Sequence, residues 1–96
     1  MAAYVIYQAE VFDPAQYEKY KAKTPESIAA FGGRFIVRGG EIDVLEGEAP
    51  PGRTVVLEFP SMPAARDWYA SDQYAEARVL RDGAVRARVY IVDGIE

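Results

Sequence analysis

Residues 3–14, Ala3-Tyr4-Val5-Ile6-Tyr7-Gln8-Ala9-Glu10-Val11-Phe12-Asp13-Pro14, place a strand directly before the start of a helix. The run from Ala3 to Val11 alternates and is rich in strand-forming residues, which predicts a β-strand. Asp13 can accept a hydrogen bond from a free N–H at a helix start. Pro14 suits the first helical position because it has no N–H to leave unpaired. The stretch therefore predicts a strand that turns immediately into a helix.

The residues after Pro14 carry a helical stripe that ends at Gly32-Gly33. The stripe has spacings of three and four, as one face of a helix requires, and consists of Tyr17, Tyr20, Thr24, Ile28 and Phe31. Pro25 lies inside it and removes one helix hydrogen bond, so we expect a kink or two abutting helices. The glycine pair is typical of a helix C-terminal cap.

The rest of the chain contains three further strand patterns and a second helical pattern. We expect strands at 34–38, 53–59 and 84–92. Residues 41–46 also alternate, and Gly39-Gly40 could join them to the 34–38 strand as a bulge. A helix follows Pro60-Ser61-Met62-Pro63, with Ser61 as its cap, and Ser71-Asp72 could cap a continuation. The predicted element order is β-α-β-β-α-β.

The two helix starts resemble each other. Residues 14–20, Pro-Ala-Gln-Tyr-Glu-Lys-Tyr, and residues 63–69, Pro-Ala-Ala-Arg-Asp-Trp-Tyr, share the pattern Pro-Ala-x-x-acid-x-Tyr. Two interlocked β-α-β units produce the order found here. We therefore predict a single α+β domain over residues 1–96, ferredoxin-like, with an antiparallel sheet.

Sorting the strand residues by alternation separates two faces of the predicted sheet. The first face is expected to carry no charge and to lie under the helices; it consists of Val5, Tyr7, Ala9, Val11, Phe35, Val37, Val55, Leu57, Phe59, Val85, Ala87, Val89 and Ile91. The second face mixes ions with the apolar residues Tyr4, Ile6, Ile36, Val56, Tyr90 and Val92. Such an apolar patch indicates a partner, and a symmetric homodimer would bury it.

Composition excludes several classes of function. The chain has 96 residues, a formal net charge of −4, no cysteine and no histidine. A Ser-His-Asp triad, a thiol nucleophile and histidine-ligated haem or zinc are therefore excluded within one chain. The acidic balance argues against a nucleic-acid face. No apolar stretch approaches the length of a membrane span, and the first residues lack a basic signal region. We expect a cytoplasmic protein without a metal or cofactor.

A set of short motifs along the chain resembles the domain-of-unknown-function 1330 family. The motifs are Ala3-Tyr4-Val5-Ile6, Phe12-Asp13-Pro14, Phe31-Gly32-Gly33-Arg34-Phe35, Val37-Arg38-Gly39-Gly40, Val44-Leu45-Glu46-Gly47, Val56-Leu57-Glu58-Phe59-Pro60-Ser61 and Trp68-Tyr69-x-Ser71-x-x-Tyr74. They span almost the whole chain in the family's order. The resemblance implies a ferredoxin-like fold that pairs as a dimeric α+β barrel. The wider superfamily includes cofactor-free monooxygenases, haem-degrading enzymes, muconolactone isomerases and ligand-binding domains.

Arg38 and Glu58 are the candidate catalytic pair, because the sequence predicts them on neighbouring strands and on the same face. A guanidinium presents a planar fork that suits a carboxylate or an enolate. A carboxylate in a half-buried cavity can have a raised pKa and act as a general base. The alternative is a structural ion pair that crosses the two strands and sets the register of a dimer. Spacing does not separate the two interpretations.

Four aromatic residues are candidates for binding a small molecule: Tyr7, Trp68, Tyr69 and Tyr74. The phenol groups of the three tyrosines could donate to a substrate oxygen, and the alternative is that each of the four rings packs in the core. The acidic cluster of Glu41, Asp43, Glu46 and Glu48 could hold a hard cation, or could be a solvated strand edge that charge protects from aggregation.

Two hypotheses for the function follow. The first is a cofactor-free enzyme, monooxygenase-like or isomerase-like, acting on a small organic acid or an aromatic compound. In it Arg38 holds the anionic oxygen, Glu58 moves the proton, and the aromatic residues shape the pocket. The second is a non-catalytic ligand-binding or structural homodimer.

Overall fold

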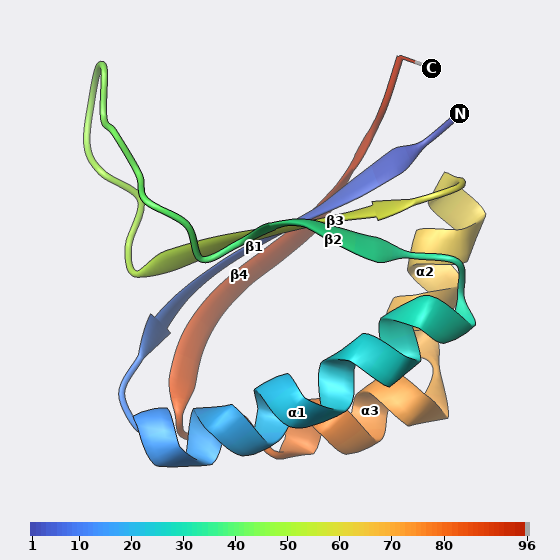
Figure 1. Ribbon diagram of the computed structural model, residues 1–96, viewed down its shortest axis with the longest axis horizontal. Helices are drawn as coiled ribbons and strands as arrows, with labels where there is room; N and C mark the ends of the chain where they lie inside the picture. The colour runs from blue at the N-terminus through green and yellow to red at the C-terminus, as the bar shows by residue number, and fades with distance from the viewer. Residues whose placement is uncertain (96) are drawn as a thin grey trace.

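The computed structural model describes residues 1–95 and has two layers, a four-stranded sheet and three helices on one of its faces (Figure 1). The elements are β1 (Ala3–Val11), α1 (Pro14–Ala30), β2 (Arg34–Arg38), β3 (Arg53–Phe59), α2 (Met62–Ala70), α3 (Asp72–Val79) and β4 (Val85–Asp93). The strand order is β2-β3-β1-β4, and every neighbouring pair is antiparallel. The predicted ferredoxin-like α+β fold is confirmed.

The helices begin where the sequence predicts. The side chain of Asp13 accepts a hydrogen bond from the Gln16 N–H, and Ser61 does the same for the Ala64 N–H. Ser71 ends α2 and caps α3 by accepting from the Tyr74 N–H. The second helical pattern is therefore two helices that share one serine.

Pro25 does not divide α1, which runs unbroken from Pro14 to Ala30. Proline cannot donate to the carbonyl one turn back, which is that of Lys21. The hydroxyl of Thr24 donates to this carbonyl instead, over 3.3 Å. A neighbouring side chain thus partly replaces the missing backbone bond and keeps the helix continuous.

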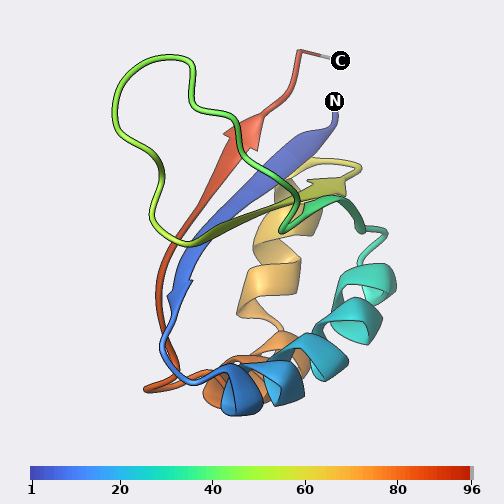
Figure 2. The same cartoon turned by 60° about the vertical axis from the view of Figure 1, so that its left-hand side comes forward.

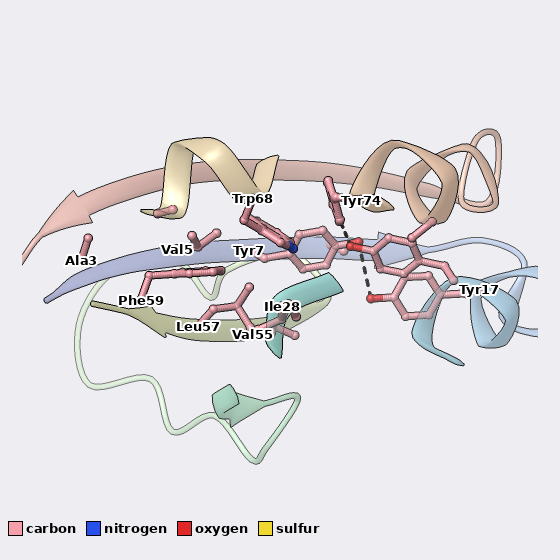
Figure 3. Packing of buried hydrophobic residues seen from close by; sticks show 14 residues of the cluster. Ala3, Val5, Tyr7, Tyr17, Ile28, Val55, Leu57, Phe59, Trp68 and Tyr74 are labelled. Atoms are coloured by element: carbon pink, nitrogen blue, oxygen red, sulfur yellow. Dashed lines mark hydrogen bonds between the residues drawn. The ribbon is translucent and has the colours of Figure 1, made fainter. Parts of the chain in front are cut away.

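The core lies between the sheet and the helices, and the alternation of β1 and β3 puts it there. Val5, Leu57 and Phe59 are fully buried on this face, and Trp68 of α2 packs on Phe59 with ring centroids 5.4 Å apart. Figure 3 shows these side chains in one layer under the helices. The opposite face of the sheet carries no helix, and we call it the open face.

A bulge in β2 changes which residues lie on the open face. Arg34 is opposite Glu58 and Phe35 is opposite Leu57, but the next pairs are Val37 with Val56 and Arg38 with Val55. Ile36 is the extra residue, and an insertion of one residue reverses the alternation beyond it. The prediction that Val37 lies under the helices and Arg38 on the open face is therefore wrong.

The alternating segment at 41–46 is not a strand in this structure. Residues 39–52 form an irregular connection that projects away from the helices, on the side of the open face (Figures 1 and 2). We call this segment the arm. The predicted glycine bulge at Gly39-Gly40 is also wrong, because the bulge lies at Ile36 and the strand ends at Arg38. Within residues 1–95, no helix has the length and apolar character that a membrane span needs.

Candidate functional site

A small cavity lies between the sheet and α1, with a volume of about 30 Å³. Its walls are the aromatic rings of Tyr7, Tyr17, Tyr20, Phe35 and Trp68 and the aliphatic side chains of Ile28, Val55 and Leu57. The cationic side chains of Lys21, Arg38 and Arg53 also line it, and none of the carboxylates within residues 1–95 does. A cavity of this volume has room for one or two water molecules. An acidic protein therefore has a locally cationic cavity.

Arg53 lies in the wall of the cavity without an anionic partner. Its guanidinium carbon is 5.6 Å from the centroid of the Tyr17 ring, and its Nε atom is buried with no hydrogen-bond partner. The guanidinium also lies close to Gly39, where an added Cβ would be 2.6 Å from Nη2 of Arg53. A glycine at position 39, with a φ of 71°, leaves room for this side chain.

Sequence reasoning missed Arg53, although a signal was available. Arg53 has the same alternation as Val55 and Leu57, and it is opposite the buried Ala9 in the sheet. The prediction that the helix-covered face carries no charge is therefore wrong. Burying a charge without a partner is unfavourable, so a charged residue on the buried face of a strand suggests a binding site. Strand alternation alone is enough to find such a residue.

Arg38 and Glu58, the predicted catalytic pair, lie on opposite faces of the sheet. Arg38 is opposite Val55 and lines the cavity, with its guanidinium 4.2 Å from the centroid of the Phe35 ring. Glu58 is on the open face, where it accepts from Nε of Arg34 at 2.8 Å and from the Tyr4 hydroxyl at 3.3 Å. The bulge at Ile36 separates the two, and the ion pair that crosses β2 and β3 is Arg34–Glu58.

The four predicted binding aromatics have different surroundings. Tyr7 lines the cavity, and Trp68 separates it from a second, more open groove of about 260 Å³ beside β4. Tyr69 lines only that groove, and its hydroxyl accepts from Arg78 at 2.6 Å. Tyr74 lines neither space and is completely buried. The structure thus brings two of the four to the cavity.

The phenols near the cavity are paired with each other. The Tyr17 hydroxyl donates to Tyr7 at 3.4 Å, and the hydroxyls of Tyr20 and Tyr74 are 2.9 Å apart. Figure 3 shows the rings of Tyr7, Tyr17 and Tyr74 meeting between β1 and the helices. Desolvation by burial raises the pKa of Tyr7 and of Tyr20 far above the ordinary phenol value. The phenols of Tyr7 and Tyr20 are therefore neutral hydrogen-bonding groups, not bases.

Arg81 is a second cation that sequence reasoning missed. Its guanidinium carbon lies 5.7 Å from the ring centroid of Tyr7 and 5.6 Å from that of Tyr20. Its Nε atom is buried without a partner. Arg81 follows α3 in a turn, where no periodic pattern assigns a side chain to a face, so its position could not be predicted from the sequence. Among residues 1–95, no cluster of three acidic, histidine or cysteine side chains could hold a metal ion.

The sequence model of the family described as "Domain of unknown function (DUF1330)" matches residues 2–95. The chain belongs to the DUF1330 family. None of the curated proteins matches this DUF1330 chain significantly.

Solved structures that resemble this DUF1330 chain share its fold at low identity. A protein of unknown function from Rhodopseudomonas palustris is 16% identical with a TM-score of 0.77, over 99% of this chain and 83% of that one. SnoaB, a cofactor-independent oxygenase from Streptomyces nogalater, is 15% identical with a TM-score of 0.62, over 99% and 94%. A candidate antibiotic biosynthesis monooxygenase from Nitrosomonas europaea is 19% identical with a TM-score of 0.58, over all of both chains. The neighbours establish a fold that is used by oxygenases.

Proposed function

We propose that this protein binds a small, planar organic acid in the cavity between the sheet and α1. The observation that carries the proposal is the lining, with three cationic side chains, three phenols and no carboxylate. Arg53 and Arg38 would hold the carboxylate of the ligand, because a guanidinium fork matches two carboxylate oxygens. The Tyr7 hydroxyl, which accepts from Tyr17, would donate its own proton to a second oxygen of the ligand, and Trp68 would pack on the planar part.

The ligand must be small, and the lining must yield to admit it. Typical ligand pockets measure about 300–1,000 Å³, whereas this cavity measures about 30 Å³. The long side chains of Lys21, Arg38 and Arg53 are the most movable part of its wall, whereas the rings of Tyr7 and Trp68 are buried. Lys21 is held towards Glu18 by an ion pair of 3.1 Å. A ligand would displace these side chains outwards to make room, and its carboxylate would then hold the two arginines in their new positions.

A cofactor-free enzyme is the second candidate, and the likeness to SnoaB favours it. In this candidate the cations and phenols would stabilise an enolate or phenolate of an aromatic substrate. Glu58 has no part in it, because its carboxylate is on the other face of the sheet. The cavity offers no carboxylate base, so the substrate itself would have to be acidic enough to ionise when it binds.

A homodimer through the open face is part of the same proposal. Four large apolar residues on that face are more than 40% exposed in a single chain: Ile36, Val37, Tyr90 and Val92. Burying them against a second copy is favourable at about 25 cal/mol per Å². A cytoplasmic location also belongs to the proposal, and a chain without cysteine suits a reducing compartment.

Trp68 provides a direct test, because it is the only tryptophan in the chain and it lines the cavity. We expect benzoate to change the Trp68 fluorescence in a saturable way, and the uncharged benzyl alcohol to bind at least tenfold more weakly. Arg53→Gln should weaken benzoate at least tenfold, which is about 1.4 kcal/mol. Lys19→Gln removes the same charge from an exposed site on α1 and should leave the affinity unchanged. Equal binding of the two probes would contradict the proposal.

A further inference from the structure

The arm contains a strand-like sequence that has no strand partner. Residues 41–46 alternate between Glu41, Asp43 and the apolar Ile42 and Val44, followed by Leu45. Ile42 and Val44 are each 42% exposed, and Leu45 is 87% exposed. An isolated extended segment is not stable as a strand in water, because its backbone groups and its apolar side need a sheet beside them. The alternation of residues 41–46 would suit pairing with the edge of a sheet, but within residues 1–95 no strand lies beside this segment to pair with it.

The outer edge of β4 is a sheet edge with which the arm could pair. β4 is the last strand of the sheet, and within residues 1–95 it pairs only with β1. Beside it on the helix-covered face lies the groove of about 260 Å³, lined in part by Tyr69, Val89 and Ile91. A long strand edge with an apolar groove beside it is a template for pairing with another strand.

The arm and β4 have opposite charge. Residues 39–52 contain four carboxylates and no basic residue, whereas β4 carries Arg86 and Arg88 on the open face. Within residues 1–95 the ion pairs are Lys21–Glu18 and Arg34–Glu58, so none involves the arm or these two arginines. Glu10 is opposite Arg86 in the sheet but forms no ion pair with it, and the Arg86 guanidinium lies 5.8 Å from the Phe12 ring centroid.

We propose that residues 41–46 of one copy add to the outer edge of β4 in a second copy, as a fifth strand of its sheet. Glu41 and Asp43 are two residues apart, as are Arg86 and Arg88, so both pairs repeat at the two-residue spacing of about 6.6 Å along a strand. In a parallel pairing with Glu41 beside Arg86 and Asp43 beside Arg88, Ile42 and Val44 point to the other face, and Val44 lies beside Val89 at the groove. The groove of each copy is then completed by residues of its partner.

A second copy is a better occupant than the arm's own β4. The arm leaves β2 and returns to β3, which are the two strands farthest from β4 in the order β2-β3-β1-β4. Both views show it projecting from the open side of the sheet (Figures 1 and 2). The inference rests on the proposed homodimer through the open face, which brings that side against a second copy.

Engineered cysteines test the contact, because the natural chain has none that could interfere. One chain carries Asp43→Cys, and a second, distinguishable by an affinity tag, carries Arg86→Cys or Arg88→Cys. These positions lie on the exposed arm or strand face, so the fold should be retained. After mixing and mild oxidation we expect a mixed disulfide dimer as the main covalent product. Lys19→Cys, on the exposed side of α1, is the matched control and should give none with Asp43→Cys.

Sedimentation of the unmodified chain separates the two levels of the proposal. A dimer in solution without the mixed disulfide would overturn the arm contact and leave the homodimer standing. A monomer at every concentration would overturn both. A chain carrying Asp43→Cys and Arg88→Cys together that closes a disulfide within itself would also overturn the proposal, because the arm would then reach its own β4.

Discussion

The tyrosines beside the cavity show how burial sets the chemistry of single residues. Tyr20 stacks on Tyr17 with ring centroids 5.5 Å apart and meets Tyr74 edge-on at 6.3 Å. The Tyr17 hydroxyl donates to that of Tyr7, and the hydroxyls of Tyr20 and Tyr74 bond to each other, so little water competes for these groups. Desolvation is the main reason that the pKa of Tyr7 and Tyr20 is raised, and hydrogen bonds and neighbouring phenols add to it. Neutral phenols in this position suit a ligand that accepts hydrogen bonds.

Alkaline solutions should destabilise the protein for the same reason. Below pH 10.0, the ordinary phenol value, both the folded and the unfolded chain hold these protons. Above it the unfolded chain releases protons that the folded chain keeps, so the free energy of unfolding falls as the pH rises. The expected slope is about 1.4 kcal/mol per pH unit for each such tyrosine. Urea unfolding across this range measures it.

Tyr20→Phe gives the control for this prediction. It removes one of the two protons concerned and should make the alkaline loss shallower, even if the variant is less stable at neutral pH. A parent whose stability is flat up to about pH 12 would contradict the assignment.

At the scale of elements, the bulge in β2 decides which side chains reach the cavity. Without Ile36 as the extra residue, Arg38 would be on the open face beside Glu58, as the plain alternation predicts. The bulge turns Arg38 under the sheet, towards Phe35 and Val55. A bulge has no fixed residue signature apart from glycine, and Ile36 is a typical strand residue, so the bulge could not be predicted from the residues of β2.

A double-mutant cycle tests this register. Glu58→Gln should couple with Arg34→Gln by about 0.2–1 kcal/mol, as partly exposed ion pairs do. The Arg34 side chain is 70% exposed and that of Glu58 is 27% exposed, which favours the lower part of that range. Glu58→Gln and Arg38→Gln should be additive within about 0.5 kcal/mol. Unfolding is measured at matched protein concentrations. Coupling to Arg38 in place of Arg34 would contradict the bulge.

Most elements could be predicted from the sequence, because their boundaries depend on local chemistry. Asp13, Ser61 and Ser71 cap the helices as their side chains allow, and the strands 34–38 and 53–59 begin and end where predicted. The arm could not, since residues 41–46 have strand alternation and only a neighbouring strand decides whether one forms. Half of the site could be predicted: Tyr7 follows from strand alternation, as Arg53 would have, and Trp68 from helical spacing, while Arg38 depends on the bulge.

The whole molecule is a half-covered sheet, and this asymmetry predicts its assembly. Three helices cover one face, and the open face exposes a patch centred on Ile6, which is opposite Val56 and Tyr90. We expect the parent to sediment as a dimer at micromolar concentration, because a patch of this size is rarely left in water. The buried residues of one chain form a core of their own beneath the helices.

Ile6→Asp is the variant that tests the dimer. A charge at the centre of the patch should shift sedimentation to the monomer while the far-ultraviolet circular dichroism stays that of the parent. Lys19→Asp, on the exposed side of α1, is the control and should leave the dimer intact. If the parent is a monomer throughout a concentration series, or if Ile6→Asp remains a dimer, the open face has another role.

Trp68 stands between the cavity under α1 and the groove beside β4, and the two spaces share this one indole as a wall. A molecule in one space that shifted the ring would take volume from the other space, and the two occupancies would then be thermodynamically linked. Such linkage is reciprocal: whatever factor an occupant of the groove imposes on affinity in the cavity, an occupant of the cavity imposes on the groove. A ligand in one of the two spaces would therefore change the binding affinity of the other through the Trp68 ring, without any change of fold.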